Sequence, residues 1–560
     1  MHKYIANLKY LLIFLVIFTV LLLVAWSCAA VRPPGGGPED TTPPYLVSVD
    51  PPSETINING GQEIRIGFSE YIDEKTVENG FYLSPITEYP LQLKYKDDEI
   101  IVNLPDSLIP DQTYVITIGR QLKDERGVEL AEPVHLAYST GNKIEQGVIR
   151  GKVYFNDGPA AVHLWDLSLL PETDSVFAQI PHFRTDVADD GSYSFQFLRP
   201  ASYQILAIER AGVGYGLKTE RFSYGVSSFT NLDLTNDSLI ANVDLPMWRE
   251  PQKLKLLRGD WMGHFHGRLY FNNVLQLVPE WLNIIDDAGN AVSNFDYFLD
   301  PLDSSSVLIV TEDSVMAAKL SLWTGGLLDG FDQEIDTASV TVRTPTTSDT
   351  MAVNVLMPET NMKLVAGASS LNLVVDKPVA VWPDTSAIRI VLNDTTEIAF
   401  TIDPVNLIQA RLIPGDEWFE VGKYKLIILG DSLIASDGTT LADSLLSIAF
   451  SSEAPVGRGG LEGKILTDNP PIMAQLSLIE NSTHSHISFV NSESNYSFNN
   501  IPEGYYNLMI FKDANQNLLY DFGSAFPFFS SEWFRIFPDT MEVRANWIIE
   551  TPELTVSEGQ

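Results

Sequence analysis

Beyond residue 44, apolar and polar positions alternate in short runs along almost the whole chain. The runs EIRIGF, LQLKY, EIIVNL, TYVITIG and VHLAYST fall between residues 63 and 140. Gly, Pro, Asn or Asp interrupt them about every 8–12 positions, a spacing typical of antiparallel β-sandwiches. Alternation places every second side chain on one face of a strand. Helical periodicity is almost absent, so the pattern predicts an all-β protein.

Two long segments repeat the same order of elements. Residues 114–155 and 424–466 each begin with a strand at a tyrosine, turn at a glycine, and reach a strand that ends in serine. The segments behind them also correspond, because GSYSFQFLRPASYQILAI (191–208) parallels SNYSFNNIPEGYYNLMIF (494–511). The repeat predicts a two-domain module that is used twice, with a further β unit between the copies.

The N-terminal segment has a different pattern. Lys3 and Lys9 precede an uncharged apolar run over residues 10–26. Its length lies at the lower edge for a membrane-spanning helix and slightly beyond the apolar region of an ordinary signal peptide. Just behind it stands Cys28, the only cysteine in 560 residues. A single cysteine cannot form an intramolecular disulfide, so its role has to be sought elsewhere.

The four residues Ala25-Trp26-Ser27-Cys28 resemble a bacterial lipobox, in which the cysteine is acylated and becomes the new N-terminus. The resemblance implies a signal peptide over residues 1–27 and a lipid anchor at Cys28. An uncleaved transmembrane helix with an incidental thiol is the alternative. Residues 28–43 are rich in Pro and Gly, which disfavour helix and strand, and are interpreted as a tether.

Three stretches carry a family resemblance: DTTPPYLVSVDPPSETINI, EIRIGFSEYIDEKTV, and TYVITIG followed by KDERGVELAE and STG. Together they resemble the SbsA-type bacterial Ig-like domain, and their position after a lipobox resembles Ig-like-domain lipoproteins of Bacteroidota. Residues 149–245 and 461–550 resemble the carboxypeptidase-regulatory, prealbumin-like sandwich. The segment 371–390 resembles a diverged second copy of the Ig-like opening, with Asp376 placed where Glu70 stands in the first.

The expected architecture is therefore a series of tandem β-sandwiches behind a lipoprotein signal peptide. Its parts are a signal peptide (1–27), a tether (28–43), an SbsA-type Ig-like domain (44–142), a carboxypeptidase-regulatory-like sandwich (147–248), an Ig-like β unit (249–346), a diverged Ig-like domain (347–455) and a second carboxypeptidase-regulatory-like sandwich (459–550).

The charge of the chain excludes some partners. It holds 73 Asp and Glu against 36 Lys and Arg, a formal net charge of −37. Nucleic-acid binding requires basic patches, so no nucleic acid is expected as a partner. The same charge opposes adsorption to an anionic membrane surface. A membrane association would therefore depend on a lipid anchor or a spanning segment.

No motif of enzymatic chemistry is found. The sequence contains no G-x-S-x-G elbow, no P-loop and no H-E-x-x-H, so a protein without catalytic activity is expected. An enzyme whose site no motif reveals is the alternative. Two histidine pairs, His264 with His266 and His484 with His486, have the spacing that would place both imidazoles on one face of a strand. Two ligands do not make a zinc site, and a solvent-facing row is the alternative.

One loop has the spacing of a calcium site. Asp513, Asn515, Asn517 and Asp521 occupy positions 1, 3, 5 and 9 of the calcium-loop pattern, and all offer oxygen ligands. Position 6 is Leu518 where that pattern has glycine, and position 12 is Ser524 where it has glutamate. The alternative is a loop stabilised by its own Asn and Asp side chains. No other cofactor is expected.

Aromatic residues are concentrated near the C-terminus, in FGSAFPFFSSEWFRIF (522–537). Exposed aromatic side chains dominate many interfaces, so the segment is a candidate partner surface. The alternative is that it forms the core of the last sandwich. Trp261 and Trp281 of the middle unit have the same two interpretations.

These observations predict a non-enzymatic outer-membrane lipoprotein that acts as an interaction or scaffold protein in the cell envelope. Its specific form would be an accessory subunit of an outer-membrane protein assembly or secretion machine, with a barrel complex as partner. Surface glycan binding or adhesion is the alternative. Surface-exported lipoproteins of this phylum often carry acidic residues after the cysteine, whereas Ala29-Ala30-Val31-Arg32 stands here, so both faces of the membrane stay open.

Overall fold

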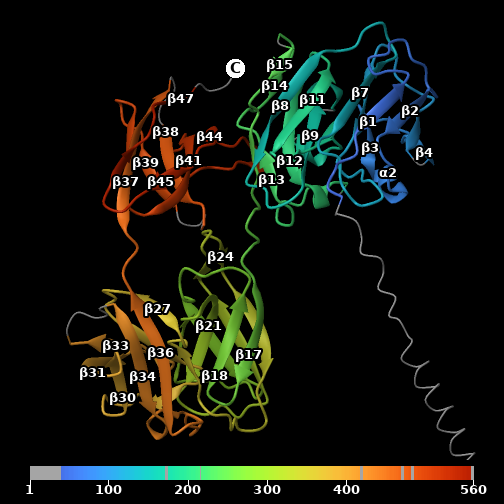
Figure 1. The fold of residues 1–560 in the computed structure, drawn as a ribbon. Helices are drawn as coiled ribbons and strands as arrows, with labels where there is room; N and C mark the ends of the chain where they lie inside the picture. The colour runs from blue at the N-terminus through green and yellow to red at the C-terminus, as the bar shows by residue number, and fades with distance from the viewer. Residues whose placement is uncertain are drawn as a thin grey trace, which may run out of the picture. The chain divides into compact units, whose positions relative to one another are not determined.

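The computed structural model describes residues 40–96, 98–170, 175–214, 216–236, 238–415, 421–467, 472–480 and 485–556. Within these ranges almost all regular structure is β-strand, with one short α-helix, α2 (Glu74–Gly80), and four single 3-10 turns (Figure 1). The all-β prediction is confirmed. The predicted signal peptide, Cys28 and most of the tether lie outside the described residues. No helix in the described part of the chain is long and apolar enough to cross a membrane.

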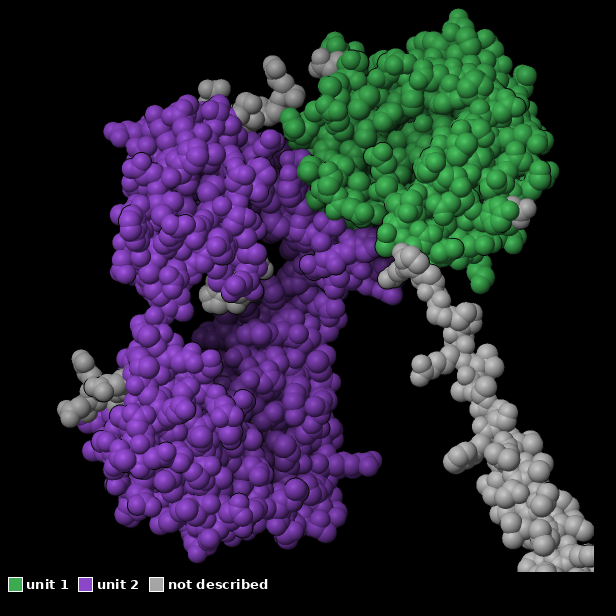
Figure 2. All heavy atoms as spheres, in the orientation of Figure 1, with its two compact units in different colours: residues 1–153, 160–205, 231–243 green, residues 154–159, 206–230, 244–560 purple. Residues whose placement is uncertain are grey.

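The chain divides into two compact units, coloured separately in Figure 2. The first consists of residues 1–153, 160–205 and 231–243, and the second of residues 154–159, 206–230 and 244–560. Their strands form pairs of stacked sheets along the chain, which are numbered below as sandwiches one to five.

Sandwich one pairs a four-stranded with a three-stranded sheet. The first has the order β1 (Leu46–Asp50), β2 (Glu63–Phe68), β5 (Glu99–Asn103), β4 (Gln92–Lys96), and the second has β3 (Phe81–Ser84), β6 (Thr113–Ile118), β7 (Val134–Ser139). In β2 the alternating pattern buries Ile64 and Ile66 completely while Arg65 faces water. Burying each isoleucine contributes about 1.5–3 kcal/mol to stability.

Sandwich two has a larger and a smaller sheet. The larger contains β10 (Phe183–Asp186), β9 (Ala160–Asp166), β12 (Ser202–Glu209) and β13 (Tyr224–Val226), with β14 (Leu232–Asp233) beside β12. The smaller contains β11 (Ser192–Leu198), β8 (Gly147–Tyr154) and β15 (Leu239–Ile240), with β16 (Leu245–Pro246) beside β8.

Sandwich three follows the same plan. Its first sheet is β17 (Leu256–Met262), β18 (His266–Phe271), β21 (Asp303–Thr311), β20 (Phe295–Asp300), and its second is β19 (Trp281–Asp286), β22 (Lys319–Gly325), β25 (Ala338–Arg343), with a small ribbon of β23 (Leu327–Leu328) and β24 (Glu334–Ile335).

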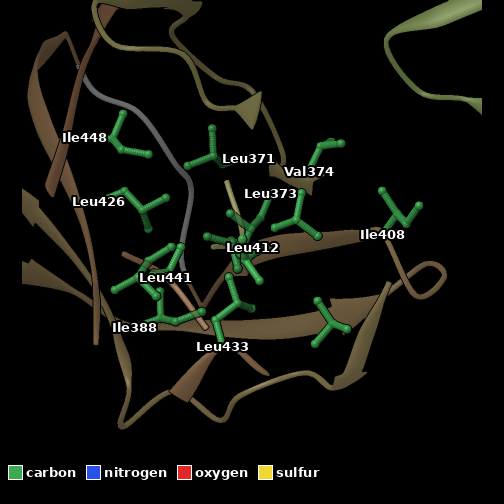
Figure 3. Packing of buried hydrophobic residues seen from close by; sticks show 14 of the residues in the cluster. Leu371, Leu373, Val374, Ile388, Ile408, Leu412, Leu426, Leu433, Leu441 and Ile448 are labelled. Carbon is green, nitrogen blue, oxygen red and sulfur yellow. The ribbon is translucent and has the colours of Figure 1, made fainter. Parts of the chain in front are cut away.

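Sandwich four encloses a large apolar core. One sheet has the order β26 (Val355–Met357), β28 (Leu371–Val375), β33 (Gln409–Pro414), β32 (Phe400–Pro404). The other has the order β27 (Met362–Val365), β36 (Leu445–Glu453), β34 (Gly422–Leu429), β30 (Ile388–Leu392), β31 (Thr396–Ile398). A two-stranded ribbon pairs β29 (Val379–Val381) with β35 (Ile434–Ala435). Figure 3 shows side chains from both sheets, such as Leu373 and Leu426, directed into one apolar interior. Both leucines are fully buried.

Sandwich five closes the described chain. One sheet has the order β40 (Asn495–Pro502), β37 (Arg458–Thr467), β46 (Ile548–Glu550), and β47 (Leu554–Val556) also pairs with β37. The other has the order β39 (Ser485–Phe489), β38 (Ile472–Leu478), β41 (Gly504–Lys512), β44 (Phe534–Ile536), and β45 (Met541–Val543) also pairs with β41. A two-stranded ribbon pairs β42 (Ser524–Ala525) with β43 (Phe528–Phe529).

The predicted repeat is visible in a matching pair of buried tyrosines. The Tyr203 hydroxyl donates to the carbonyl of Arg199 over 2.8 Å, and the Tyr506 hydroxyl donates to the carbonyl of Pro502 over 2.8 Å. In both cases the acceptor lies four residues upstream at the turn before the strand. Sandwiches two and five thus close this corner in the same way, which confirms the correspondence of residues 191–208 and 494–511.

The backbone also relates sandwich one to sandwich four, with a correction to the register. The Ser69 N–H donates to the carbonyl of Tyr45, and the Asp376 N–H donates to the carbonyl of Asn354. Asp376 therefore takes the place of Ser69, and Lys377 takes the place of Glu70. Pairing Asp376 with Glu70 was wrong because a shift of one residue along a strand exchanges its two faces.

Candidate functional site

The predicted calcium loop follows strand β41 and brings its four residues together. Asp513 is 3% exposed, and its two carboxylate oxygens accept the N–H groups of Asn517 (3.1 Å) and Leu518 (3.0 Å). The side-chain amides of Asn515 and Asn517 both donate to Asp521 Oδ2, over 2.6 and 3.3 Å. Backbone and side-chain hydrogen bonds thus join the four residues into one cluster, and calcium binding by them stays a prediction.

A fifth oxygen donor in this cluster was missed by the sequence pattern. Glu532 is 9% exposed, and its carboxylate accepts the N–H groups of Ala514 (2.6 Å) and Asp521 (3.2 Å). Burial, reinforced by the charges of Asp521 and Asp513, raises the pKa of Glu532 above its usual value. The fold brings it to the loop from beyond the 12-residue calcium pattern. The one signal in the sequence was a single acidic residue within an aromatic segment.

The aromatic segment 522–537 is mostly occupied by contacts inside the second unit. Phe522 stacks on Trp248 with ring centroids 5.7 Å apart, and Phe534 meets Tyr154 edge to face at 5.3 Å. Phe534 also lies in a buried cluster with Met473, Met509 and Phe511 of sandwich five, so the core interpretation is confirmed for this ring, whereas Phe522 packs on Trp248 of sandwich two. Phe526 and Phe529 remain 41% and 64% exposed.

The first histidine pair is buried, which corrects the expectation of two residues on one strand face. His264 lies in the turn before β18 and is 9% exposed, and His266 begins that strand and is 6% exposed. A ring nitrogen of His264, Nε2, is 3.2 Å from the Pro345 carbonyl oxygen. Burial lowers the pKa of His266 to about 4, so its imidazole is neutral at pH 7. Of the second pair, His484 lies outside the described residues.

The two tryptophans of the middle unit differ. Trp261 is 5% exposed and belongs to the core of sandwich three. Trp281 lines a surface pocket of about 340 Å³ together with Phe295, Asn283 and Trp323. Trp323 is 44% exposed and stands directly opposite Asn283 on the neighbouring strand. This arrangement offers an open pocket lined by two indoles, a phenyl ring and a polar amide.

One hydroxyl–imidazole pair has the composition of a nucleophile and its base. Thr117 Oγ1 lies 3.1 Å from His135 Nδ1 on the adjacent strands β6 and β7. Burial lowers the pKa of His135 to about 4. A general base works best with a pKa near the operating pH, so this imidazole is a poor activator of a hydroxyl at neutral pH.

Comparison with known proteins places part of the chain. Residues 40–140 match the model of the bacterial Ig-like domain family. That range coincides with sandwich one and covers less than a fifth of the chain. No curated protein matches the chain in sequence.

Three solved structures illustrate the structural neighbours. The N-terminal part of the bacterial S-layer protein SbsC is 8% identical, with 36% of this chain and 44% of that chain covered and a TM-score of 0.16. The N-terminal four Ig domains of Dscam1 isoform 9.44 are 10% identical, with 73% and 100% covered and a TM-score of 0.21. The titin domains z1z2 in complex with telethonin are 13% identical, with 37% and 98% covered and a TM-score of 0.13. At these values the likeness carries no argument about function.

Proposed function

We propose that the protein is a lipid-anchored component of the cell envelope that acts without catalysis, as an interaction or scaffold protein. Cys28 carries the lipid and holds the chain in the outer membrane. The observation that carries the proposal is the order of segments: a lipobox-like sequence, a Pro/Gly tract, an Ig-like match from residue 40 and a series of further sandwiches. This order suits a protein that presents binding surfaces at a distance from its anchor.

A scaffold benefits from stiff junctions, and one is present in the first unit. The Arg120 N–H donates to Asp186 Oδ2 over 2.7 Å, and its guanidinium donates to the Val187 carbonyl over 3.2 Å. Next to it, the Arg184 guanidinium lies over the Tyr82 ring, 3.3 Å from the centroid. Arg120 and Tyr82 belong to sandwich one and the other three residues to sandwich two, so the contacts restrict bending between them.

A second junction of this kind lies in the second unit. Leu308 and Val310 of β21 are 3% and 1% exposed, and both belong to the core cluster of sandwich four. Sandwiches three and four therefore share apolar contacts across their boundary. Sharing a core couples two domains more strongly than a flexible linker does.

The experiment compares wild-type protein with Cys28→Ser in the native host. We expect the wild type in the outer-membrane fraction, labelled by radioactive fatty acid, and the variant unlabelled and released from that fraction. Cross-linking followed by pull-down of the wild type should recover barrel proteins of an assembly or secretion complex. An unmodified Cys28, or recovery of the chain alone, would contradict the anchor or the scaffold role respectively. Protease treatment of intact cells assigns the face of the membrane.

A second candidate function is glycan binding, because of the pocket between Trp281 and Trp323. Aromatic faces stack on the apolar side of sugar rings, and Asn283 can bind a hydroxyl. In a glycan array, Trp323→Ala should then abolish binding. Trp547→Ala is the matched control, since Trp547 is 67% exposed on sandwich five, outside this pocket. An array on which the wild type binds no glycan rejects this function.

A further inference from the structure

Three carboxylates from separate segments meet at one corner of sandwich one. Asp40 precedes β1 and Glu70 follows β2. Asp124 lies between β6 and β7, and its backbone forms a β-bridge with Ile72. One oxygen of each carboxylate lies within 4.8 Å of the others. Like charges this close repel each other unless a cation lies between them.

Asp124 has a carboxylate oxygen that no protein group satisfies. The residue is 2% exposed, and its Oδ1 accepts the N–H groups of Arg126 and Val128, both over 2.8 Å. Its Oδ2 is buried and has no hydrogen-bond partner in the described structure. A buried charged oxygen without a partner is costly, so this atom calls for a ligand.

An ion pair with Arg126 compensates only part of the charge of this corner. Arg126 Nε lies 3.5 Å from Asp40 Oδ2, and the Arg126 side chain is 68% exposed. Three carboxylates and one guanidinium leave the corner with two negative charges. The guanidinium lies toward the solvent and contacts Asp40, whereas the unpartnered oxygen belongs to Asp124.

Sandwich four has a corresponding corner, which contains the ammonium group of a lysine. Asp349 corresponds to Asp40, because each lies five residues before the paired positions Asn354 and Tyr45. Each also accepts the N–H two residues on, Met351 for Asp349 and Thr42 for Asp40. Lys377, in the place of Glu70, directs its ammonium to Asp349 Oδ2 at 2.8 Å.

The loop between the last two strands of the corner corresponds as well. The Gly127 N–H donates to the Asp124 carbonyl, and the Gly438 N–H donates to the Ala435 carbonyl. Ala435 therefore stands where sandwich one has Asp124, and Asp437 stands where it has Arg126. Asp437 Oδ2 lies 3.1 Å from the Lys377 ammonium. Sandwich four thus has a built-in cation where sandwich one has three carboxylates.

We infer that Asp40, Glu70 and Asp124 bind a calcium ion. All three are oxygen ligands, which hard divalent cations prefer, and calcium–oxygen distances of 2.3–2.6 Å allow two bound oxygens to lie up to about 5 Å apart. The observed limit of 4.8 Å satisfies this condition. The ion occupies the position that the Lys377 ammonium takes in sandwich four, and it fixes the segment at Asp40 to the corner. Extracellular modules bind calcium with dissociation constants of about 10⁻⁴–10⁻³ M.

The test is calcium titration of the detergent-solubilised full chain, freed of metal with EDTA, by calorimetry and by equilibrium dialysis with radioactive calcium. Asp124→Asn keeps the shape of the side chain and should weaken binding at this site at least about tenfold. Glu70→Lys places the lysine of sandwich four in this corner and should abolish binding there while circular dichroism remains that of the wild type. Glu125→Gln is the matched control, because it removes an exposed neighbouring carboxylate outside the cluster.

A variant of the loop at Asp513 distinguishes calcium binding in that loop from calcium binding by Asp40, Glu70 and Asp124. The titrations are repeated in Asp521→Asn protein, which removes the negative charge and one carboxylate oxygen of Asp521 from that loop. The inference predicts that calcium binding sensitive to Asp124→Asn persists in this background. It is overturned if the full chain binds no calcium at millimolar concentrations, or if Asp124→Asn and Glu70→Lys bind calcium as the wild type does.

Discussion

Replacing Lys377 by methionine removes the internal cation of sandwich four. The Lys377 ammonium donates to the Met351 carbonyl at 2.6 Å, besides its contacts with Asp349 and Asp437, and its side chain is 6% exposed. Methionine fills a similar volume but leaves two carboxylates facing each other. Removing one partner of a buried ion pair costs about 3–5 kcal/mol of folding free energy. Asp349 and Asp437 are 28% and 15% exposed, so water partly resolvates them and the lower end is expected.

The assay must be local, because a chain of several domains does not unfold in one step. Hydrogen exchange of strands β34 and β36 reports the opening of sandwich four. A loss of about 3 kcal/mol corresponds to a drop of roughly a hundredfold in protection, at 1.36 kcal/mol per decade. Lys363→Met is the matched control in the same sandwich. Its ammonium also lies 2.8 Å from a carboxylate, that of Glu453, but both side chains are more than half exposed, at 69% and 54%.

Exposed ion pairs contribute about 0–1 kcal/mol, so Lys363→Met should leave protection nearly unchanged. The double variant Lys377→Met/Asp437→Asn should recover part of the loss, because it removes one of the two stranded charges. The reasoning is refuted if Lys377→Met and Lys363→Met have equal effects on β34 and β36.

The pH dependence of this corner has a defined sign. Hydrogen bonding to Lys377 lowers the pKa of Asp349 below 3.8, and for Asp437 the bonds from Thr439 and Lys377 outweigh burial and also lower the pKa. For Lys377, burial is outweighed by the two carboxylates and the pKa rises above 10.5. The stabilisation of sandwich four by these ion pairs is therefore full between pH 3.8 and pH 10.5. It is lost as the pH falls through the lowered carboxylate pKa values, or rises through that of the lysine.

Three further outcomes are expected. Tyr138→Phe should destabilise sandwich one by about 1–2 kcal/mol, measured by exchange of β7, because the buried Tyr138 hydroxyl donates to the Pro51 carbonyl over 2.9 Å. Burial and the charge of Arg184 lower the pKa of His163 to about 3, so its imidazole should show no titration above pH 5 by NMR. The contribution of the neutral imidazole to stability should be full above pH 6.5 and be lost as the pH falls toward 3. Arg120→Ala should speed proteolysis between sandwiches one and two several-fold, because the guanidinium also binds Asp189 at 2.5 Å; an unchanged cleavage rate contradicts a stiff junction.

The strands could be predicted because alternation is a local property of the sequence. In β2 every second residue is buried, as the run EIRIGF requires. The repeated tyrosine corners were accessible for the same reason, since donor and acceptor lie four residues apart. The register of the second Ig-like copy was accessible too, because LNLVV and IRIGF alternate in phase only when Asp376 stands against Ser69. Matching the two acidic residues Asp376 and Glu70 instead shifted the register by one, and the hydrogen bonds to Asn354 and Tyr45 reveal the error.

The candidate sites depend on contacts that no local pattern contains. Glu532 reaches the loop of Asp513 across a hairpin of aromatic residues, and Trp323 reaches Trp281 by pairing of β19 with β22. Asp40, Glu70 and Asp124 come from three separate segments. In a chain with 73 acidic residues, individual carboxylates carry little information until the fold shows which of them converge.

The two related corners solve one electrostatic problem in different ways. Each sandwich opens with an aspartate beside a strand end, and this negative group has to be balanced for the opening segment to lie against the domain. In sandwich four the balance comes from a lysine of the chain, so the closure is permanent between acid and alkaline pH. In sandwich one the lysine is a glutamate and an alanine has become Asp124, which makes closure depend on a cation from solution. Asp40 lies directly behind the Pro/Gly tract of the sequence, so we expect calcium to fix the segment before β1 to sandwich one.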